Sequence, residues 1–408
     1  MRDKDLYQQI LGLSAPWFVA DVELCQEEQR VVVHVGRTRS SALECPECSK
    51  EMVGYDSRER RWRHLDTCQY ETILVADVPR GRCVDHGVRQ IRVPWAEPGS
   101  QFTALFERLV IDWLKEASQT AVARTLGLSW DEVHGVMERA VRRGLERREI
   151  RDAHLLGVDE KSFRKRHEYV TVVTCIEDGT VLHVADERKR ESLDQFYESL
   201  SPEQRSEVFA VAMDMWAPYI RSTEENLPNA TIVFDRFHIA KHLTEAVDRV
   251  RRGENKELRR KGDHRLVGTR YDWLVNPDSK DLSWKRDFAE LRKSELKTAR
   301  AWAIKETARR LWNYVYPGAA RNFFARWYGW AVRSRLEPMK KAAKTLKNHL
   351  NGILAYLEHP ITNATAEGVN SKIQWIKYTA RGFRNRQNFK TAILFHCGGL
   401  RLYPHESQ

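Results

Sequence analysis

Three short apolar runs in this chain each end in an aspartate: Leu155–Asp159, Phe209–Asp214 and Thr231–Asp235. Their Val, Ile, Leu and Phe residues show no helical periodicity, which predicts buried central strands of a sheet. The carboxyl ends of neighbouring strands in an α/β sheet meet at one edge, where ligands bind. Clustered carboxylates are costly unless a cation neutralises them. The pattern therefore predicts a divalent metal site at that edge.

The pattern along the rest of the chain divides it into five sections. Strand-like runs surround paired cysteines at the start, and a helical section follows. Strands then alternate with helices, including a hairpin turned at residues 177–179. A long helical section and a closing helix with a basic tail complete the chain. The expected domains are 1–98 (zinc-binding, β-rich), 99–150 (helix-turn-helix), 151–236 (first part of an α/β core), 237–358 (helical insertion) and 359–408 (closing helix and basic tail).

The basic residues are concentrated in the long helical section. The formal charge of the 408-residue chain is +11. Residues 237–350 alone hold 28 Lys and Arg against 13 Asp and Glu, a net charge of +15. Residues 370–401 add seven basic residues and no acid. Such runs often mark only a solvated helix face, but their concentration favours a polyanionic partner, in particular nucleic acid.

Composition excludes several other classes of protein. No apolar stretch approaches the roughly 18–20 residues of a membrane span, and the first residues lack the apolar core of a signal peptide. The seven cysteines are odd in number and unevenly spaced, which argues against a disulfide framework. We therefore expect a cytoplasmic protein, associated with the bacterial nucleoid if it binds DNA.

Two pairs of metal-ligating residues lie in the first section: Cys45 with Cys48, and Cys83 with His86. Each pair has two intervening residues, and 34 residues separate the pairs. Structural Zn²⁺ takes four S or N ligands in this arrangement, and a thin β-rich core gains folding energy from it. His64 or Cys68 could replace one ligand. Three further cysteines are expected to be small buried residues: Cys25, Cys175 and Cys397.

Residues 118–133 have the layout of a helix-turn-helix. Ala123 permits close helix packing, Gly127 suits a left-handed turn, and Val133 would pack the second helix on the first. Ser129 and Glu132 form a capping box that opens the second helix, 129–147. An ordinary helical hairpin is the alternative. If the motif binds DNA, the second helix enters the major groove through its N-terminal residues, and the candidate contacts are Ser129, Trp130, Asp131, His134, Arg139, Arg142 and Arg143.

A closing helix is expected between Pro360 and Gly382. Its apolar stripe is Val369, Ile373 and Ile376, and its polar face carries Glu367, Asn370, Ser371 and Gln374. A merely solvated glutamate is the alternative interpretation of this face. Basic residues flank it, as expected where a phosphate backbone approaches: Lys372, Lys377, Arg381, Arg384 and Arg386.

Two strand aspartates and one helix glutamate would hold two Mg²⁺ or Mn²⁺ ions about 3.5–4 Å apart. Hard carboxylate oxygens suit these ions, whereas the cysteine pairs suit zinc. The sequence thus predicts two unlike metal sites in one chain.

Several segments together resemble the signature blocks of the ISL-three family of bacterial insertion-sequence transposases. The paired cysteines, the helix-turn-helix and residues 268–271 follow in the same order as in that family. The resemblance spans essentially the whole chain. The segments that carry it are Gly157–Phe163, Met213–Tyr219, Phe234–His238 and Thr362–Lys372.

The resemblance implies a DDE transposase, an enzyme that uses three acidic residues for phosphoryl transfer on DNA. It implies a multidomain α/β protein whose mixed-sheet catalytic core is RNase H-like and is interrupted by a large helical insertion, after a zinc-ribbon-like module and a helix-turn-helix. The implied triad is Asp159, Asp214 and Glu367, with Glu367 following Asp214 by 153 positions.

The role of Asp235 and His238 stays open on the sequence. They could orient the scissile phosphate or bind metal, or His238 could be a satisfied core histidine. Asn370 is a further auxiliary candidate. Tryptophans of the insertion could contact or unstack bases, although most are expected in the core: Trp273, Trp284, Trp302, Trp312, Trp327 and Trp330.

The expected function is binding of the terminal inverted repeats of an insertion sequence through residues 1–150, followed by Mg²⁺-dependent strand cleavage and strand transfer. Double-stranded DNA of the transposon ends and of the target is the expected partner, bound by a homodimer or larger assembly. Two alternatives are a domesticated, non-catalytic DNA-binding regulator and an RNase H-like nuclease that cuts without joining.

Overall fold

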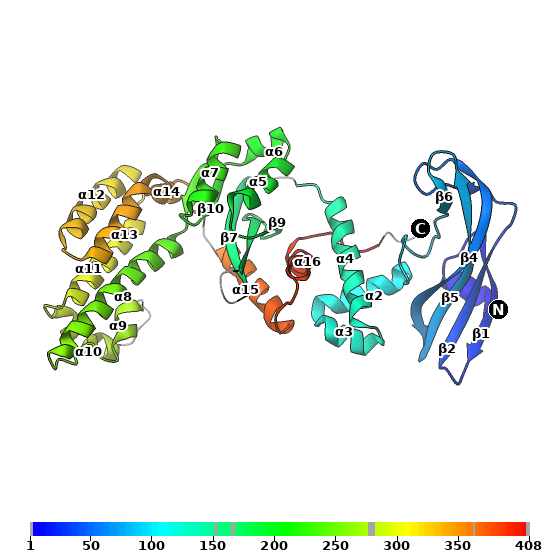
Figure 1. The fold of residues 1–408 in the computed structure, drawn as a ribbon, viewed down its shortest axis with the longest axis horizontal. Helices are drawn as coiled ribbons and strands as arrows, with labels where there is room; N and C mark the ends of the chain where they lie inside the picture. Colours follow the sequence, from blue (N-terminus) through cyan, green and yellow to red (C-terminus); the bar gives the residue numbers. More distant parts are fainter. Residues whose placement is uncertain (1–2, 151–152, 165–167, 276–281, 362–363, 405–408) are drawn as a thin grey trace. The chain divides into compact units, whose positions relative to one another are not determined.

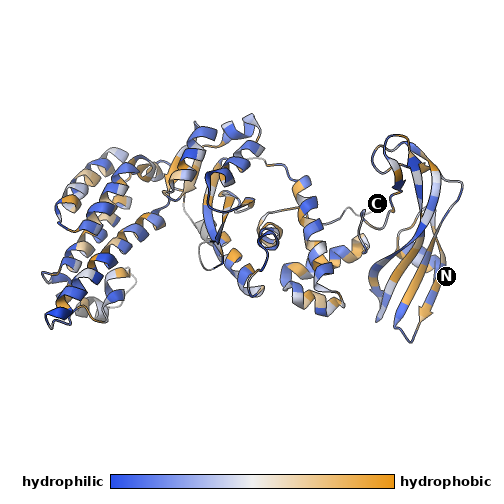
Figure 2. Ribbon diagram, in the orientation of Figure 1, coloured by the Kyte–Doolittle hydropathy of each residue, from blue (hydrophilic) through white to orange (hydrophobic). Residues whose placement is uncertain are grey.

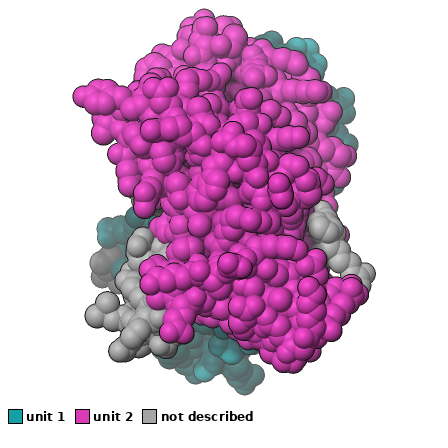
Figure 3. All heavy atoms as spheres, turned by 90° about the vertical axis from the view of Figure 1, so that its left-hand side faces the viewer, with its two compact units in different colours: residues 1–149, 376–382, 394–408 teal, residues 150–375, 383–393 magenta. Residues whose placement is uncertain are grey.

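A computed structural model describes residues 3–150, 153–164, 168–275, 282–361 and 364–404 (Figure 1). The side chains of residues 282, 283, 285–287 and 364–367 lie outside this description. The chain forms two compact units. The first comprises residues 1–149, 376–382 and 394–408, and the second residues 150–375 and 383–393 (Figure 3).

The first unit begins with a β-rich module built on a six-stranded mixed sheet. Its order is β1-β2-β5-β4-β3, with β6 paired to β5; β2 and β5 are parallel. Trp17, Trp62 and Trp95 pack edge to face in its core. Short helix α1 precedes the sheet. The elements are α1 (Asp3–Ile10), β1 (Trp17–Cys25), β2 (Arg30–Arg37), β3 (Leu43–Glu44), β4 (Glu51–Thr67), β5 (Tyr70–Cys83) and β6 (Gly87–Gln90).

Three helices follow in the first unit: α2 (Ala104–Glu116), α3 (Gln119–Leu126) and α4 (Trp130–Glu146). The expected helix-turn-helix is confirmed in detail. Gly127 ends α3 with a left-handed φ of 66°, and the Ser129–Glu132 capping box opens α4. Ala123 and Val133 are both buried between the helices.

The first unit is completed by residues from the far end of the chain. The segment Leu400–Tyr403, here called the C-terminal strap, lies on α2 and α4. A Cβ added to Gly144 of α4 would lie 2.6 Å from the Leu400 side chain. Arg143 and Arg147 of α4 donate hydrogen bonds to the carbonyl oxygens of Leu402 and Tyr403, respectively. Leu402 is buried.

The second unit is built on a five-stranded mixed sheet of order β11-β10-β7-β8-β9. Strands β10 and β11 run parallel to β7, whereas β8 is antiparallel to both of its neighbours, β7 and β9. The expected hairpin is confirmed, and Gly179 takes a positive φ of 74° in its turn. The strands are β7 (Leu155–Arg164), β8 (Glu168–Cys175), β9 (Val181–Asp186), β10 (Ala210–Met213) and β11 (Thr231–Phe234).

Two of the three apolar runs end as predicted. β10 and β11 stop one residue before Asp214 and Asp235. The prediction that the first run ends at Asp159 is wrong, because β7 continues to Arg164. The reason is that β7 has two neighbours. Its parallel pairing with β10 ends at Gly157, whereas its antiparallel pairing with β8 continues to Arg164.

Helices connect the strands of this sheet and continue into a long helical section. Between β9 and β11 lie α5 (Arg190–Ser199), α6 (Pro202–Glu207) and α7 (Ala217–Asn226). The described residues between β11 and α15 form helices and loops without strands. These helices are α8 (Arg236–Arg260), α9 (Arg270–Leu274), α10 (Leu282–Lys293), α11 (Lys297–Ala308), η2 (Arg309–Asn313), α12 (Pro317–Arg333), α13 (Glu337–Asn348), α14 (Leu350–Leu354) and η3 (Ala355–Leu357).

One apolar core runs from the sheet into this helical section, so the two form one packed body. The helices alternate apolar and polar faces (Figure 2). The expectation that most tryptophans here are core residues is confirmed for Trp273 and Trp327. Helix α14 closes on β11: a Cβ on Gly352 would lie 2.6 Å from the Phe234 ring. This close packing fixes the end of β11, directly before Asp235.

The expected closing helix is α15 (Ala364–Thr379). Its stripe of Val369, Ile373 and Ile376 is buried, and the chain turns at Arg381 and Gly382, both with positive φ. The expectation of only a basic tail beyond it is wrong. A further helix, α16 (Arg386–Cys397), forms there because four apolar side chains at helical spacing are buried: Phe389, Ala392, Ile393 and Phe395.

Candidate active site and metal centre

The strand register brings three aspartates to one edge of the five-stranded sheet. Ala212 of β10 pairs with Gly157 on one side and with Val233 on the other. Asp159, Asp214 and Asp235 each lie two residues beyond these partners. The three carboxylates therefore leave three adjacent strands at the same level.

These aspartates line one small pocket. His238, from the first turn of α8, and Asn370, from α15, line it as well. The pocket thus combines strand residues with His238 and Asn370 of two helices, which are 132 residues apart in sequence. The structure brings Asp159, Asp214 and Asn370 together at this pocket.

Asp159 is held on both sides of its carboxylate. Its Oδ2 accepts a hydrogen bond from Asn370 Nδ2 at 3.1 Å and lies 2.5 Å from Lys161 Nζ. The backbone N–H of Glu160 donates to Oδ1 at 2.7 Å. Lys161 is buried, so its ammonium neutralises the carboxylate where solvent screens it little.

Asp214 contacts two cationic groups. Its Oδ1 lies 3.4 Å from His238 Nδ1, and its Oδ2 lies 3.3 Å from an Arg188 guanidinium nitrogen. Burial alone would raise the pKa of Asp214, but the hydrogen bond and charge of His238, together with the Met215 N–H and Arg188, outweigh burial and lower it. The site thus favours an ionised carboxylate.

His238 connects the two acids that follow β10 and β11. Its Nε2 lies 3.7 Å from Asp235 Oδ2, while its Nδ1 faces Asp214. The hydrogen bond to Asp214 raises the pKa of His238, against the lowering effect of burial. Asp235 also caps α8, because its Oδ1 accepts from the Phe237 N–H at 2.8 Å. His238 therefore lies in the acid pocket and not in the apolar core.

Glu367, the third acid of the expected triad, belongs to α15, three residues before Asn370. Its side chain lies outside the described residues.

Sequence analysis missed three charged neighbours of the aspartates: Glu160, Lys161 and Arg188. Arg188 contacts Glu160 and Asp214, and its guanidinium lies 4.1 Å from the centre of the Trp216 ring. Burial raises the pKa of Glu160. Lys161 could have been found from its spacing, two residues after Asp159 on one face of a strand. No sequence signal marks Arg188, which reaches the site from the loop after β9.

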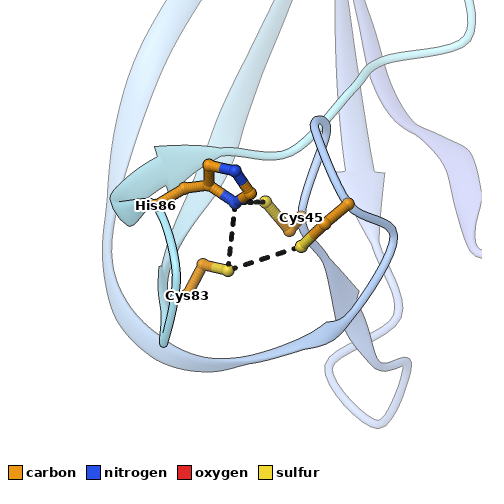
Figure 4. Close-up of side chains that lie close together, drawn as sticks. Cys45, Cys83 and His86 are labelled. Carbon is orange, nitrogen blue, oxygen red and sulfur yellow. Dashed lines mark hydrogen bonds between the residues drawn. The ribbon is translucent and has the colours of Figure 1, made fainter.

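The four expected zinc ligands converge in the first unit. The ligand atoms of Cys45, Cys48, Cys83 and His86 all lie within 4.8 Å of one another. His86 Nδ1 is 3.7 Å from Cys45 Sγ and 3.6 Å from Cys83 Sγ (Figure 4). Burial would raise the pKa of Cys83, but hydrogen bonds from His86 and from backbone N–H groups outweigh it and lower the pKa to about 6. A thiolate is the form that zinc binds.

The two possible substitute ligands lie elsewhere. His64 is buried and hydrogen-bonds the Thr103 hydroxyl at 2.9 Å, and Cys68 is exposed. Neither belongs to the four-residue cluster. Cys175 and Cys397 are buried as expected, and Cys25 is partly buried.

The structure separates the candidate DNA contacts of α4 into two groups. Ser129, Trp130, Asp131 and Arg142 are exposed. Arg139 and Arg143 instead pair with buried Glu107, at 2.6 and 3.0 Å, and His134 is buried against Trp130. In the structure, the side chains of these last three residues are occupied by contacts within the module.

The basic residues of the chain's last part also differ in their surroundings. Lys372, Arg381 and Arg384 are exposed, and Lys377 is half-buried. Arg386 lies 3.6 Å from Glu168 and 3.9 Å from Asp186, so part of its charge is balanced within the protein. Among the described residues, no helix has the length and apolar character that crossing a membrane requires.

Three family models match successive parts of the chain. Residues 156–393 match the sequence model of a transposase family, the DDE transposases of ISL3. Residues 91–141 match the helix-turn-helix domain of transposase family ISL3, and residues 42–93 match the zinc finger of transposases IS204, IS1001, IS1096 and IS1165.

Individual relatives are similar over nearly their full lengths. The transposase for insertion sequence element IS1557 of Mycobacterium tuberculosis is 30% identical over 434 aligned residues, which cover 98% of this chain and 97% of the relative. The transposase for IS1001 of Bordetella parapertussis is 29% identical over 396 residues, covering 95% and 97%. With its three family modules and its full-length relatives, the chain belongs to the ISL3 family of transposases.

Proposed function

We propose that this protein binds the terminal inverted repeats of its insertion sequence and catalyses metal-dependent cleavage and transfer of DNA strands. The observation that carries the proposal is the register of Asp159, Asp214 and Asp235, joined by Asn370 of α15. Paired acidic residues at one sheet edge are the arrangement that phosphoryl transfer on DNA requires.

We propose Asp159, Asp214 and Glu367 as the catalytic triad. Glu367 lies three residues before Asn370, and residues three apart on an α-helix share a face. Asn370 hydrogen-bonds Asp159. This contact and the three-residue spacing support the proposal of Glu367 as the third acid.

The donor set of the pocket fits Mg²⁺ or Mn²⁺. The three aspartates offer hard carboxylate oxygens, and the pocket residues include no thiol. When bound, such ions lower the pKa of an attacking water or 3′-hydroxyl and stabilise the leaving oxygen. Asn370 and Lys161 fix the position of Asp159, while His238 and Arg188 hold Asp214 in place and favour its ionised form by lowering its pKa.

We further propose that the five-stranded sheet is an RNase H-like core. Its three antiparallel strands β7–β9 and two parallel strands β10 and β11 place the first two acids on adjacent central strands. The helical section between β11 and α15 is then the insertion that separates the second acid from the third. Two ends must be brought together for transposition, so we propose a homodimer or larger assembly on DNA.

The exposed N-terminal residues of α4 are the proposed base-reading surface. Ser129, Trp130 and Asp131 begin the second helix of the motif, the part that enters the major groove in helix-turn-helix proteins. Arg142 on the same helix and the exposed cations Lys372, Arg381 and Arg384 are proposed phosphate contacts.

We propose Cys45, Cys48, Cys83 and His86 as the ligands of a structural Zn²⁺. Removing one thiolate leaves an incomplete tetrahedral site. Cys45→Ser should therefore lower the zinc content per chain severalfold and lower the melting temperature of the β-rich module. Cys68→Ser, which removes an exposed thiol outside the cluster, is the matched control. Equal zinc content in both variants would contradict the assignment.

The decisive experiment compares binding and cleavage of a duplex that carries one transposon end. Asp159→Asn should bind this duplex as the wild type does and lose cleavage by at least a hundredfold, because the amide cannot replace the ionised oxygen. Asp178→Asn, the same substitution at an exposed turn residue, should change neither. Loss of binding together with cleavage in Asp159→Asn would instead assign this residue to folding.

A second measurement separates transposition from simple hydrolysis. A labelled 3′-ended oligonucleotide with the end sequence is incubated with the protein and a supercoiled plasmid. Covalent transfer of the label to the plasmid is expected. Cleavage without transfer would favour a nuclease, and end binding without cleavage would favour a regulator.

A further inference from the structure

Two large aromatic side chains are exposed at the edge where the acids lie. Trp216 is 37% exposed and Phe237 is 63% exposed. Each lies two residues after an acid, Asp214 or Asp235. Because β10 and β11 are parallel and in register, both rings belong to segments that leave the sheet at the same edge.

Short hydrogen bonds fix the backbone of both segments. The Trp216 N–H donates to the carbonyl of Asp214 at 2.7 Å, and the Phe237 N–H donates to the carboxylate of Asp235 at 2.8 Å. The centre of the Phe237 ring is 5.8 Å from that of His238, whose Nδ1 faces Asp214. Phe237 is therefore held beside the acid pocket by its own backbone, not by apolar packing.

Cationic side chains accompany both rings. Arg188 lies over one face of Trp216 at 4.1 Å. Arg236 and Lys241 are close to Phe237 in sequence on the first turns of α8, and both are exposed; the Arg236 guanidinium lies 5.9 Å from the centre of the Trp312 ring. Exposed aromatics interleaved with cations are the combination that binds unpaired nucleotides, whose bases stack on the rings while the phosphates meet the charges.

The base faces inside a duplex are covered by their neighbours, so a ring can stack only on a base that has left the helix. A phosphate held at Asp159 and Asp214 has its flanking bases within reach of the same sheet edge. We propose that Phe237, with Trp216, stacks on an unpaired base next to the scissile phosphate, so that the DNA is locally opened at the cut. The proposal rests on the proposed strand cleavage and makes both aromatics positioning residues for it.

Photochemical cross-linking of the full-length protein tests the contact directly. Duplexes with one transposon end carry 5-iododeoxyuridine singly at each position within three nucleotides of the junction. Irradiation should attach one of these positions to the tryptic peptide 237–241, which begins with Phe237. Cross-links that never include residues 216 or 237 would overturn the proposal.

Cleavage rates test whether the contact opens the duplex. Phe237→Ala should cut a fully paired end about tenfold more slowly, and a mismatch beside the cut should restore the rate to within about twofold, since base stacking on an aromatic accounts for roughly this factor or more. Phe237→Trp should retain the wild-type rate. Tyr316→Ala, at an aromatic 76% exposed before α12, is the matched control and should match the wild type.

Two rate results would overturn the proposal: an unchanged cleavage rate for Phe237→Ala on the paired end, or a loss of cleavage rate that the mismatch does not restore. A Phe237→Ala complex with DNA that contains fewer protein copies than the wild-type complex would also overturn it, because the ring would then contact a second chain. The proposed function fails separately, if the wild type cuts neither the paired nor the mismatched end in the presence of Mg²⁺.

Discussion

Two neighbouring arginines of α4 show how surroundings decide the role of a residue. Arg143 is buried in ion pairs with Glu97 and Glu107, whereas Arg142 is exposed. Removing one partner of a buried ion pair leaves an uncompensated charge, which costs far more than losing an exposed cation. The sequence alone gives both residues the same character, because only tertiary packing brings Glu97 and Glu107 to one of them.

Replacing each of the two arginines by alanine should affect different properties, stability in one case and DNA binding in the other. Arg143→Ala should lower the free energy of unfolding of the first unit by roughly 3 kcal/mol, as measured by urea denaturation. Arg142→Ala should leave that stability unchanged and weaken binding of the transposon end. The slope of log affinity against log salt should fall by about 1. Equal stability losses in both variants would contradict the assignment of Arg143 as a structural residue.

His64 gives the first unit a dependence of stability on pH. Burial, with the nearby charge of Arg63, lowers the pKa of His64 from 6.5 to about 4. Between these values the unfolded chain binds a proton that the folded protein does not, so stability falls as pH falls from 6.5 to 4. The shift corresponds to roughly 3 kcal/mol at the lower limit.

Urea denaturation at pH 7 and pH 5 measures this effect as a difference between variants. The free energy of unfolding of His64→Gln should fall less between pH 7 and pH 5 than that of the wild type. His34→Gln, at a half-exposed histidine of the same module, should retain all of it. If the stability of His64→Gln falls with pH as much as that of the wild type, the pH dependence belongs to other groups, such as the cysteine and histidine cluster.

At the scale of elements, the sequence predicted the helices and strands whose apolar pattern is unbroken. α15 and the helix-turn-helix were predictable because their buried faces follow a period of 3.6 residues, and β10 and β11 because each is a continuous apolar run. The continuation of β7 beyond Asp159 was not, since residues 160–164 are mostly polar and their pairing depends on β8. Helix α16 was missed because Arg386 and Lys390 lie within it and obscure its apolar stripe.

The acid site was predictable to the same degree. The ends of apolar runs gave Asp159 and Asp214, and the polar face of α15 gave Asn370. The contact of Arg188 with Asp214 depends on how the loop after β9 returns to the sheet edge, which no spacing in the sequence encodes.

The C-terminal strap makes a prediction at this scale. The Tyr403 hydroxyl donates to Asp112 at 2.5 Å and accepts from Lys115 at 2.6 Å, and the ring lies 4.3 Å from that ammonium. Tyr403→Ala should therefore raise amide hydrogen exchange in α2 and α4 severalfold and lower stability by about 1–3 kcal/mol. Arg401→Ala, at an exposed neighbour, is the control; equal exchange in both variants would show that the strap does not support the helices.

For the whole molecule, the concentration of positive charge in the helical insertion is the dominant electrostatic feature. Residues 237–350 of this section carry a net charge of +15, which exceeds the +11 of the entire chain. Counterions released from DNA make binding by such a surface steeply dependent on salt. The insertion should therefore contribute affinity without sequence preference, while α4 supplies the preference.

Three exposed lysines of α13 test this division: Lys341, Lys344 and Lys347. Their joint replacement by glutamine should weaken binding of specific and random duplexes equally and reduce the slope of log affinity against log salt by up to about 2.7. Lys340→Gln is the matched control, because Lys340 already pairs with Glu337 at 2.6 Å. An unchanged slope in the triple variant would place the phosphate contacts elsewhere.

The C-terminal strap also limits how this enzyme can be re-engineered. A chimera that takes its DNA-recognition helices from one relative and its catalytic core from another cannot be made with a single splice near residue 150. The donor's last residues must be exchanged too, because Leu402 and Tyr403 complete the surface on which α2 and α4 rest. Retargeting such a transposase therefore requires two coordinated grafts, separated by some 250 residues of unchanged polypeptide.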